Sequence, residues 1–145
     1  MDIFRITEEY VAAAALTEAA TLDTAWSAAQ IREAMDREDT LYLIAVDGGT
    51  LCAIASCVFS AYEAMIENVA VAPEYRRRGA ASALLAVIEE EAIKRRLECI
   101  SLEVASKNSG AVLLYEKAGF AKAGIRKGFY RKQNDDALVM VKEIC

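Results

Sequence analysis

A basic turn followed by glycine and small residues is the segment of this sequence best suited to binding chemistry. It lies in VAVAPEYRRRGAASALL, residues 69–85, where an apolar run ends at Pro73. A helix predicted to open after Gly79 presents amides that have no intrahelical partner, at the positive end of its dipole. Such a helix start binds phosphate, and the small side chains leave the backbone accessible. The expected contacts of a phosphorylated cofactor are Arg76, Arg77, Arg78, Gly79, Ala80, Ala81 and Ser82.

Two further residues have side chains that could transfer protons. Glu103 is a charge near the end of a strand that is otherwise expected to be buried, and Tyr115 lies on a later helix. A positioned carboxylate can act as a general base. A tyrosine with an ordinary pKa near ~10 is protonated at neutral pH and can act as a general acid. Taken alone, Glu103 is better explained as a salt-bridge partner at the rim of a site, and Tyr115 could be a core residue with a satisfied hydroxyl.

The rest of the sequence limits the possible chemistry. The chain has no histidine, which removes Ser-His-Asp relays and the usual zinc ligand sets, so we expect no metal. Its four cysteines form no Cys-x-x-Cys pair and are expected to be reduced thiols. The net charge of −5 does not favour binding to nucleic acid. With no secretion signal and no apolar stretch long enough to span a membrane, we expect one cytoplasmic domain over residues 1–145.

The elements that must position these residues follow from periodicity and capping signals. They predict a mixed sheet with helices packed on it, of α/β or α+β class, in the order β-α-α-β-β-β-α-β-α-β-β. The expected strands are 3–6, 41–46, 51–59, 64–71, 99–104, 120–130 and 137–141. The expected helices are 7–20, 28–37 with Ser27 as its N-cap, 79–96, and one from Asn108 to Gly119.

Two motifs in this order resemble the signatures of the GNAT family of N-acetyltransferases, which use acetyl-CoA. The first signature is matched by Arg76-x-x-Gly79-x-Ala81. The second is matched at Asn108, Ala111, Leu114, Tyr115, Gly119 and Phe120. The resemblance covers nearly the whole chain. It implies a mostly antiparallel sheet of about seven strands, splayed at its centre, with about four helices.

The resemblance also implies a role for each candidate. Glu103 would be the general base, acting directly or through water, and Tyr115 the general acid toward the leaving thiolate. The backbone of Val69, Ala70 and Val71 would bind the pantetheine arm, with the Val71 amide donating to the reacting carbonyl. Asn108 would contact the CoA arm. The residues from Arg76 to Ser82 would hold the pyrophosphate.

Within the family, the chain resembles most the bacterial ribosomal-protein-alanine N-acetyltransferases. Their Pro-Trp-Ser segment corresponds to Ala25-Trp26-Ser27. Their Leu-Glu-Val-Arg strand end corresponds to Leu102-Glu103-Val104-Ala105. Ala25 replaces the proline and Ala105 replaces the arginine of this pattern. Both departures affect the expected acceptor more than the expected reaction. An Arg-x-x-Tyr-Tyr-like segment of these relatives corresponds to Arg126–Tyr130. Trp26 and Tyr130 are therefore the expected acceptor-side residues. Trp26 would pack near the acceptor groove, and Tyr130 could contact the acceptor peptide or cap the sheet.

The expected activity is transfer of an acetyl group from acetyl-CoA to the N-terminal α-amine of a protein, with a ribosomal protein as the favoured acceptor. Two alternatives remain open at this point. The same machinery could acetylate a small amine or a lysine side chain, or the chain could be a non-catalytic acyl-CoA-binding partner. We expect a monomer or a weak homodimer that binds neither nucleic acid nor membrane.

Overall fold

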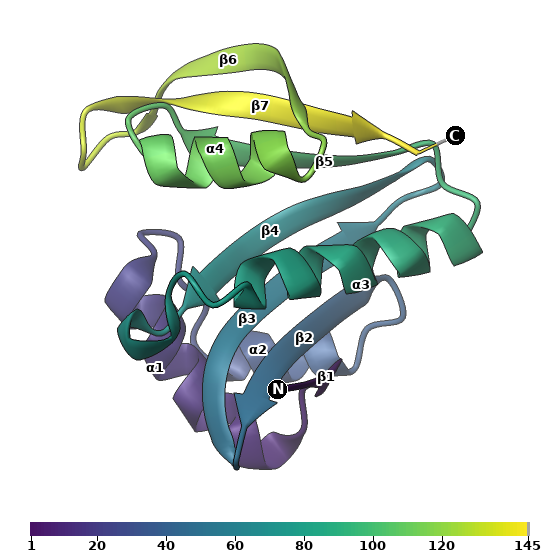
Figure 1. The fold of residues 1–145 in the computed structure, drawn as a ribbon, viewed down its shortest axis with the longest axis vertical. Coiled ribbons are helices and arrows are strands. Elements are labelled where there is room, and N and C mark those ends of the chain that lie inside the picture. Colours follow the sequence, from purple (N-terminus) through teal and green to yellow (C-terminus); the bar gives the residue numbers. More distant parts are fainter. Residues whose placement is uncertain (145) are drawn as a thin grey trace.

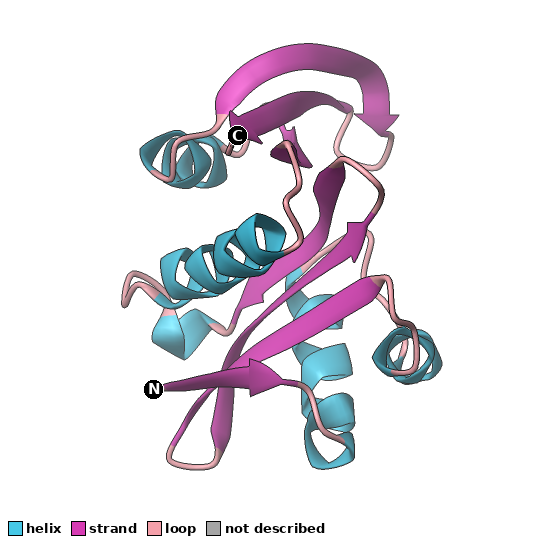
Figure 2. Cartoon of the chain, turned by 90° about the vertical axis from the view of Figure 1, so that its right-hand side faces the viewer, coloured by secondary structure: helices cyan, strands magenta, loops and turns pink. Residues whose placement is uncertain are grey.

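A single mixed sheet with helices on both faces makes up residues 1–144, which the computed structural model describes (Figures 1 and 2). The sheet order is β1-β2-β3-β4-β5-β7-β6, and every neighbouring pair is antiparallel except β4 and β5. The strands are β1 (Asp2–Arg5), β2 (Thr40–Asp47), β3 (Thr50–Phe59), β4 (Glu63–Val71), β5 (Cys99–Ala105), β6 (Ala121–Tyr130) and β7 (Asp135–Glu143). The α-helices are α1 (Val11–Thr21), α2 (Ala28–Met35), α3 (Ala80–Lys94) and α4 (Ser109–Lys117). Short 3-10 turns cover Glu8–Tyr10 and Pro73–Tyr75.

The order of elements and the predicted fold are confirmed, and two helix starts form as expected. Ser27 caps α2 in a capping box with Gln30. The side chain of Asn108 accepts a hydrogen bond from the amide of Ala111 at the start of α4. The start of the first helix is a correction. Thr7 makes no side-chain cap, so a 3-10 turn comes first and α1 begins only at Val11.

The sheet separates two apolar cores. One lies between the sheet and α3 and includes Leu84 and Ile88, both fully buried. The other lies under α1 and α2 and includes Val11 and Ile31. Cys52, Cys57 and Cys99 are free thiols, while Cys145 lies outside the described residues.

The sheet opens between β4 and β5, as the resemblance implies. These strands pair only where Glu63–Met65 lies beside Cys99–Ser101, and then they diverge (Figure 1). β4 also carries a bulge, since Ser56 pairs with Asn68 and Cys57 pairs with Ile66, leaving Glu67 without a partner on β3. A bulge bends its strand and redirects side chains. In the described part of the chain, no helix is long and apolar enough to cross a membrane.

Candidate functional site

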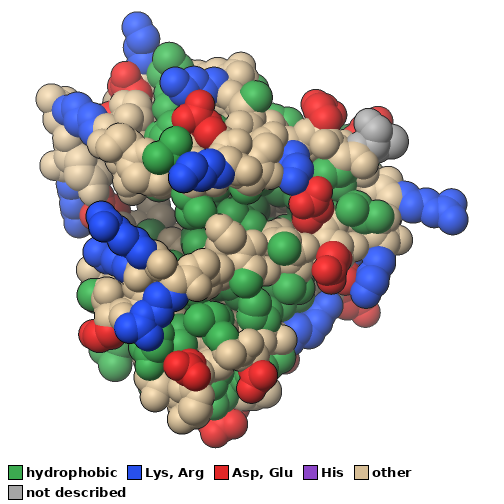
Figure 3. All heavy atoms as spheres, in the orientation of Figure 1, with side chains coloured by type: hydrophobic (Ala, Val, Ile, Leu, Met, Phe, Trp, Pro, Cys, Tyr) green, Lys and Arg blue, Asp and Glu red, His purple; other side chains and the backbone are tan. Residues whose placement is uncertain are grey.

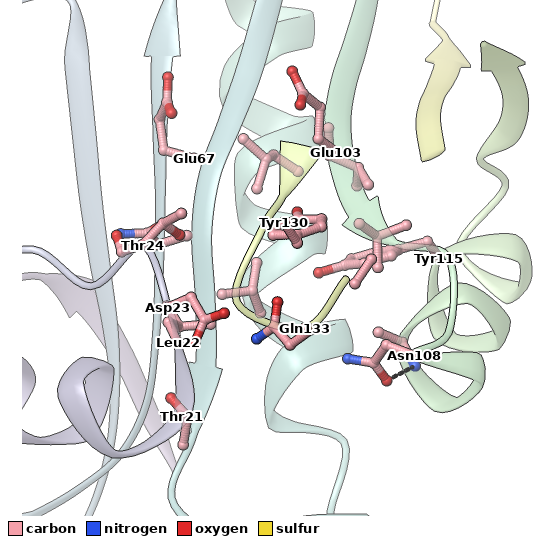
Figure 4. Close-up of a pocket in the computed structure, with 17 residues that line it drawn as sticks. Thr21, Leu22, Asp23, Thr24, Glu67, Glu103, Asn108, Tyr115, Tyr130 and Gln133 are labelled. Atoms are coloured by element: carbon pink, nitrogen blue, oxygen red, sulfur yellow. Dashed lines mark hydrogen bonds between the residues drawn. The ribbon is translucent and has the colours of Figure 1, made fainter. Parts of the chain in front are cut away.

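A pocket occupies the opening between the diverging strands. Its walls come from the middle of β4, the end of β5, the first turns of α4 and the segment after α1. Figure 3 shows the surface hollowed between the part that carries β6, β7 and α4 and the rest of the molecule, with Lys and Arg side chains at the rim. The predicted site residues that line the pocket are Val69, Glu103, Asn108, Tyr115 and Tyr130 (Figure 4).

Glu103 lines this pocket and has one oxygen in an ion pair. Its Oε1 accepts a hydrogen bond from Nη1 of Arg126 on β6 at 2.6 Å, so the salt bridge that the sequence left open is present. Its Oε2 is buried and has no hydrogen-bond partner among the described residues. A buried carboxylate oxygen without a donor is costly. The pair with Arg126 fixes the carboxyl group, while Oε2 is left to accept a proton or a hydrogen bond from a bound molecule.

Tyr115 lies on the α4 side of the same pocket. Only 8% of the residue is exposed, and its ring packs edge-on against Phe120 with 6.0 Å between centroids. Figure 4 shows its hydroxyl pointing toward the middle of the pocket, near Tyr130. Burial, together with the neighbouring Tyr130, raises the pKa of Tyr115 to about 12. The hydroxyl therefore keeps its proton across the neutral range.

A second carboxylate, Glu67 on β4, lies across the opening from Glu103. It lines the cavity on the α1 side together with Met65 and Trp26. Figure 4 shows the carboxylates of Glu67 and Glu103 pointing the same way, from β4 and β5. Burial is the main cause that raises the pKa of Glu67, and the charge of Glu103 adds to it. The bulge that brings Glu67 to the pocket has no clear signal in the sequence.

The predicted phosphate segment lies outside this pocket, at the turn from β4 into α3. Arg76, Arg77 and Arg78 are all exposed there. Gly79 is the N-cap of α3 with φ +80°, and it offers no side chain to satisfy the first amides. A Cβ on Gly79 would meet no atom within 4 Å, so the space beside Gly79 itself is open. Ala80 and Ala81 are buried against the sheet, Ser82 is exposed, and Ala70 and Val71 lead into the turn.

Replacing Gly79 with alanine should weaken binding of the acetyl donor. A non-glycine residue at this positive φ costs roughly 1–2 kcal/mol, and relief of that strain would shift the backbone that presents the first amides of α3. We expect the KM for acetyl-CoA to rise about tenfold and the KM for the acceptor to change little. Steady-state kinetics with each substrate varied in turn tests this. An unchanged KM for acetyl-CoA would contradict a phosphate site here.

The acceptor-side residues border a second, adjoining cavity on the α1 side of the opening. Trp26, Met65, Glu67, Phe129 and Tyr130 line it. Glu103 and Tyr130 line both cavities, so they lie where the two meet. Trp26 is half-buried and packs near Tyr42. Trp26 and Tyr130 thus line one cavity, but Trp26 is not part of the pocket that holds Tyr115, and their contact with an acceptor stays a prediction.

Three contributions to the site were not predicted. The first is the pairing of Arg126 with Glu103. The second is Gln133, from the turn between β6 and β7, in the main pocket. The third is Glu18 on α1, which is fully buried beneath the segment that carries Trp26. For Glu18 a signal existed, since it follows Val11 and Ala14 on the buried face of an alanine-rich helix. No group of three metal-ligating side chains lies together within residues 1–144.

Comparison with known proteins identifies the family. Residues 3–120 match the sequence profile described as the Acetyltransferase (GNAT) family. The chain is 37% identical over 98 residues to the [ribosomal protein bS18]-alanine N-acetyltransferase of Escherichia coli K12, covering 66% of each chain. The corresponding enzyme of Salmonella typhimurium LT2 is 35% identical over 111 residues, covering 75% of this chain and 74% of the relative.

A solved structure extends the similarity over the full fold. The ribosomal-protein-S18-alanine N-acetyltransferase from Escherichia coli superposes with a TM-score of 0.88 at 30% identity, covering 99% of this chain and 93% of that one. The expected likeness to the ribosomal-protein-alanine enzymes is thereby confirmed. This chain belongs to the GNAT family of acetyltransferases, whose acetyl donor is acetyl-CoA.

Proposed function

We propose that this protein transfers the acetyl group of acetyl-CoA to the N-terminal α-amine of a ribosomal protein, and that bS18 is the acceptor. The names of the relatives support the acceptor. The observation that carries the reaction is that one pocket is lined both by Glu103, whose buried Oε2 has no hydrogen-bond partner among the described residues, and by Tyr115. A ribosomal acceptor would be met in the cytoplasm.

Acetyl-CoA, the acetyl donor, would be bound mainly by backbone amides and carbonyls. Beyond Met65, the edge of β4 that faces β5 has no strand partner among the described residues, so its amides and carbonyls can bind an extended pantetheine arm as a further strand. The amide of Val71 is proposed as donor to the thioester oxygen, a contact worth roughly 3–4 kcal/mol in comparable sites. The amides from Gly79 to Ser82 and Arg76–Arg78 would hold the pyrophosphate, and Asn108 would contact the arm beside its own helix cap.

Two side chains then move the protons. Oε2 of Glu103 accepts a proton from the attacking amine, directly or through water, as the new C–N bond forms. The C–S bond breaks, and Tyr115 donates its proton to the departing thiolate. Burial raises the pKa of Tyr115 to about 12, so the hydroxyl still carries its proton when the thiolate departs.

The acceptor side suits a cationic chain end. Glu63, Glu67 and Glu103 all line the cavity that holds Trp26 and Tyr130, and they would attract an ammonium group as it approaches. An α-amine has a pKa near ~8 and a lysine near ~10.4, so far more of the α-amine is neutral and reactive at neutral pH. This difference favours a chain N-terminus over a lysine side chain.

Thiol release from acetyl-CoA tests the proposal with three acceptors. One is a peptide with the N-terminal sequence of bS18, the second is the same peptide with a blocked N-terminus and one internal lysine, and the third is a polyamine. We expect release only with the first peptide. Release only with the polyamine would overturn the N-terminal assignment, and acetyl-CoA binding without release on any acceptor would point to a non-catalytic module.

A further inference from the structure

A buried polar cluster lies beneath the segment between α1 and α2. At its centre is Glu18, whose exposed fraction is 0%. Oε1 of Glu18 accepts hydrogen bonds from the amide of Trp26 at 2.9 Å and from Nδ2 of Asn68 at 2.6 Å. Its Oε2 accepts a hydrogen bond from the hydroxyl of Tyr42. A buried carboxylate is costly unless its oxygens are well satisfied, and here each oxygen has a donor.

The donors come from three separate parts of the fold. Tyr42 lies on β2, Asn68 on β4, and Trp26 on the segment that follows α1. Asn68 also accepts a hydrogen bond from the hydroxyl of Thr24 at 3.4 Å, and its Nδ2 lies 3.4 Å from the carbonyl oxygen of Thr24. The cluster therefore ties the segment 22–27 to two strands of the sheet. Thr24 bonds directly to Asn68 on β4, and Trp26 is connected through Glu18 to Tyr42 on β2.

One of these points is the bulge of β4. Asn68 directly follows Glu67, the β4 residue that has no partner on β3. Asn68 turns toward Glu18 on α1, while the carboxylate of Glu67 lines the two cavities of the site. The cluster thus fixes the segment that carries Trp26 against the strand that borders the reaction pocket. Thr24 lines both cavities, which places this segment at their junction.

We propose that Glu18 is a positioning residue for acceptor binding: through Trp26, Asn68 and Tyr42 it holds the segment 22–27 at the distance from β4 that an acceptor N-terminus requires. Glu18 touches no substrate in this role. The inference rests on the proposed function for its kinetic consequence, whereas the positioning itself is a property of the folded chain.

A matched pair of substitutions separates this role from simple stability. Glu18→Met keeps the length of the side chain and removes both oxygens, so the amide of Trp26 loses its partner. Glu18→Gln keeps one oxygen for the amides of Trp26 and Asn68, and its amide group can donate to the hydroxyl of Tyr42. Ile88→Val is the control, because Ile88 is fully buried in the core on the other face of the sheet.

Two measurements are made on each folded variant: steady-state kinetics with the bS18 peptide and acetyl-CoA, and tryptophan fluorescence, for which Trp26 is the single reporter. For Glu18→Met we expect the acceptor KM to rise about tenfold, as the loss of hydrogen bonds to a charged group implies, with the KM for acetyl-CoA nearly unchanged. The emission of Trp26 should shift to the red. Glu18→Gln and Ile88→Val should stay close to wild type in both measurements.

The outcomes are distinguishable. Unchanged Trp26 emission and acceptor KM in Glu18→Met would overturn the inference, as would an equal rise in both KM values or the same response in Ile88→Val. If Glu18→Met does not fold, Tyr42→Phe removes one donor and should give a smaller shift in the same direction, while no shift would overturn the inference. If the wild-type protein acetylates no peptide, the proposed function fails, and the emission of Trp26 still decides whether Glu18 positions the segment.

Discussion

Replacing Tyr115 with phenylalanine should lower kcat by about 10²- to 10³-fold and leave the affinity for acetyl-CoA nearly intact. The substitution removes the proposed proton donor to the leaving thiolate and keeps the ring that packs against Phe120. Because the hydroxyl of Tyr115 has no hydrogen-bond partner within the described residues, its loss strands no buried group, and the fold should hold. Stopped-flow or steady-state thiol release measures kcat, and calorimetric titration measures the affinity for acetyl-CoA.

The pKa of Tyr115 adds a second readout to this prediction. A pKa raised to about 12 means that the proton is held to higher pH than on an ordinary tyrosine, whose pKa lies near ~10. The wild-type rate should therefore show no fall from loss of this proton below about pH 11. Tyr62→Phe is the control, since Tyr62 is 66% exposed in the turn between β3 and β4. Equal kcat values for Tyr115→Phe and the control would remove Tyr115 as the acid.

Replacing Glu103 with glutamine should lower kcat/KM for the acceptor by about 10²-fold and flatten its rise with pH. The amide oxygen of glutamine can still accept the hydrogen bond from Arg126, so the site keeps its geometry while it loses a base. Loss of the Glu103 charge also removes one of the two causes that raise the pKa of Glu67, which should move toward its ordinary value.

The control for this substitution is Glu98→Gln, an exposed carboxylate just before β5. Its pH–rate profile should match that of the wild type. If Glu103→Gln also keeps the wild-type profile, another group accepts the proton, and Glu67, with its raised pKa and its place in the same pocket, is the first to test.

Much of this site could be predicted because local signals and local structure agree. The caps at Ser27 and Asn108 form as their residue types require, and the order of strands and helices follows from hydrophobic periodicity. Glu103 and Tyr115 were found as motif residues, and the structure places both on one pocket. Their roles in proton transfer remain predictions.

The features of the site that could not be predicted depend on contacts between segments that are distant in the sequence. The pairing of Arg126 with Glu103 spans two strands that are not neighbours in the sheet, and no local pattern records it. The bulge of β4 shows only in the register with β3, so the sequence did not resolve the orientation of Glu67. Glu18 carried a signal, a charge on a buried helix face, but its donors lie 8, 24 and 50 residues away.

We propose that the opening between β4 and β5 directs acetyl transfer to a chain N-terminus. The most direct test is to incubate the protein with acetyl-CoA and a peptide that has both a free N-terminal alanine and an internal lysine, and to locate the product acetyl group by fragment-ion mass spectrometry. We expect one acetyl group on the α-amine and none on the lysine. Acetylation of the lysine, or of both groups at similar rates, would contradict it.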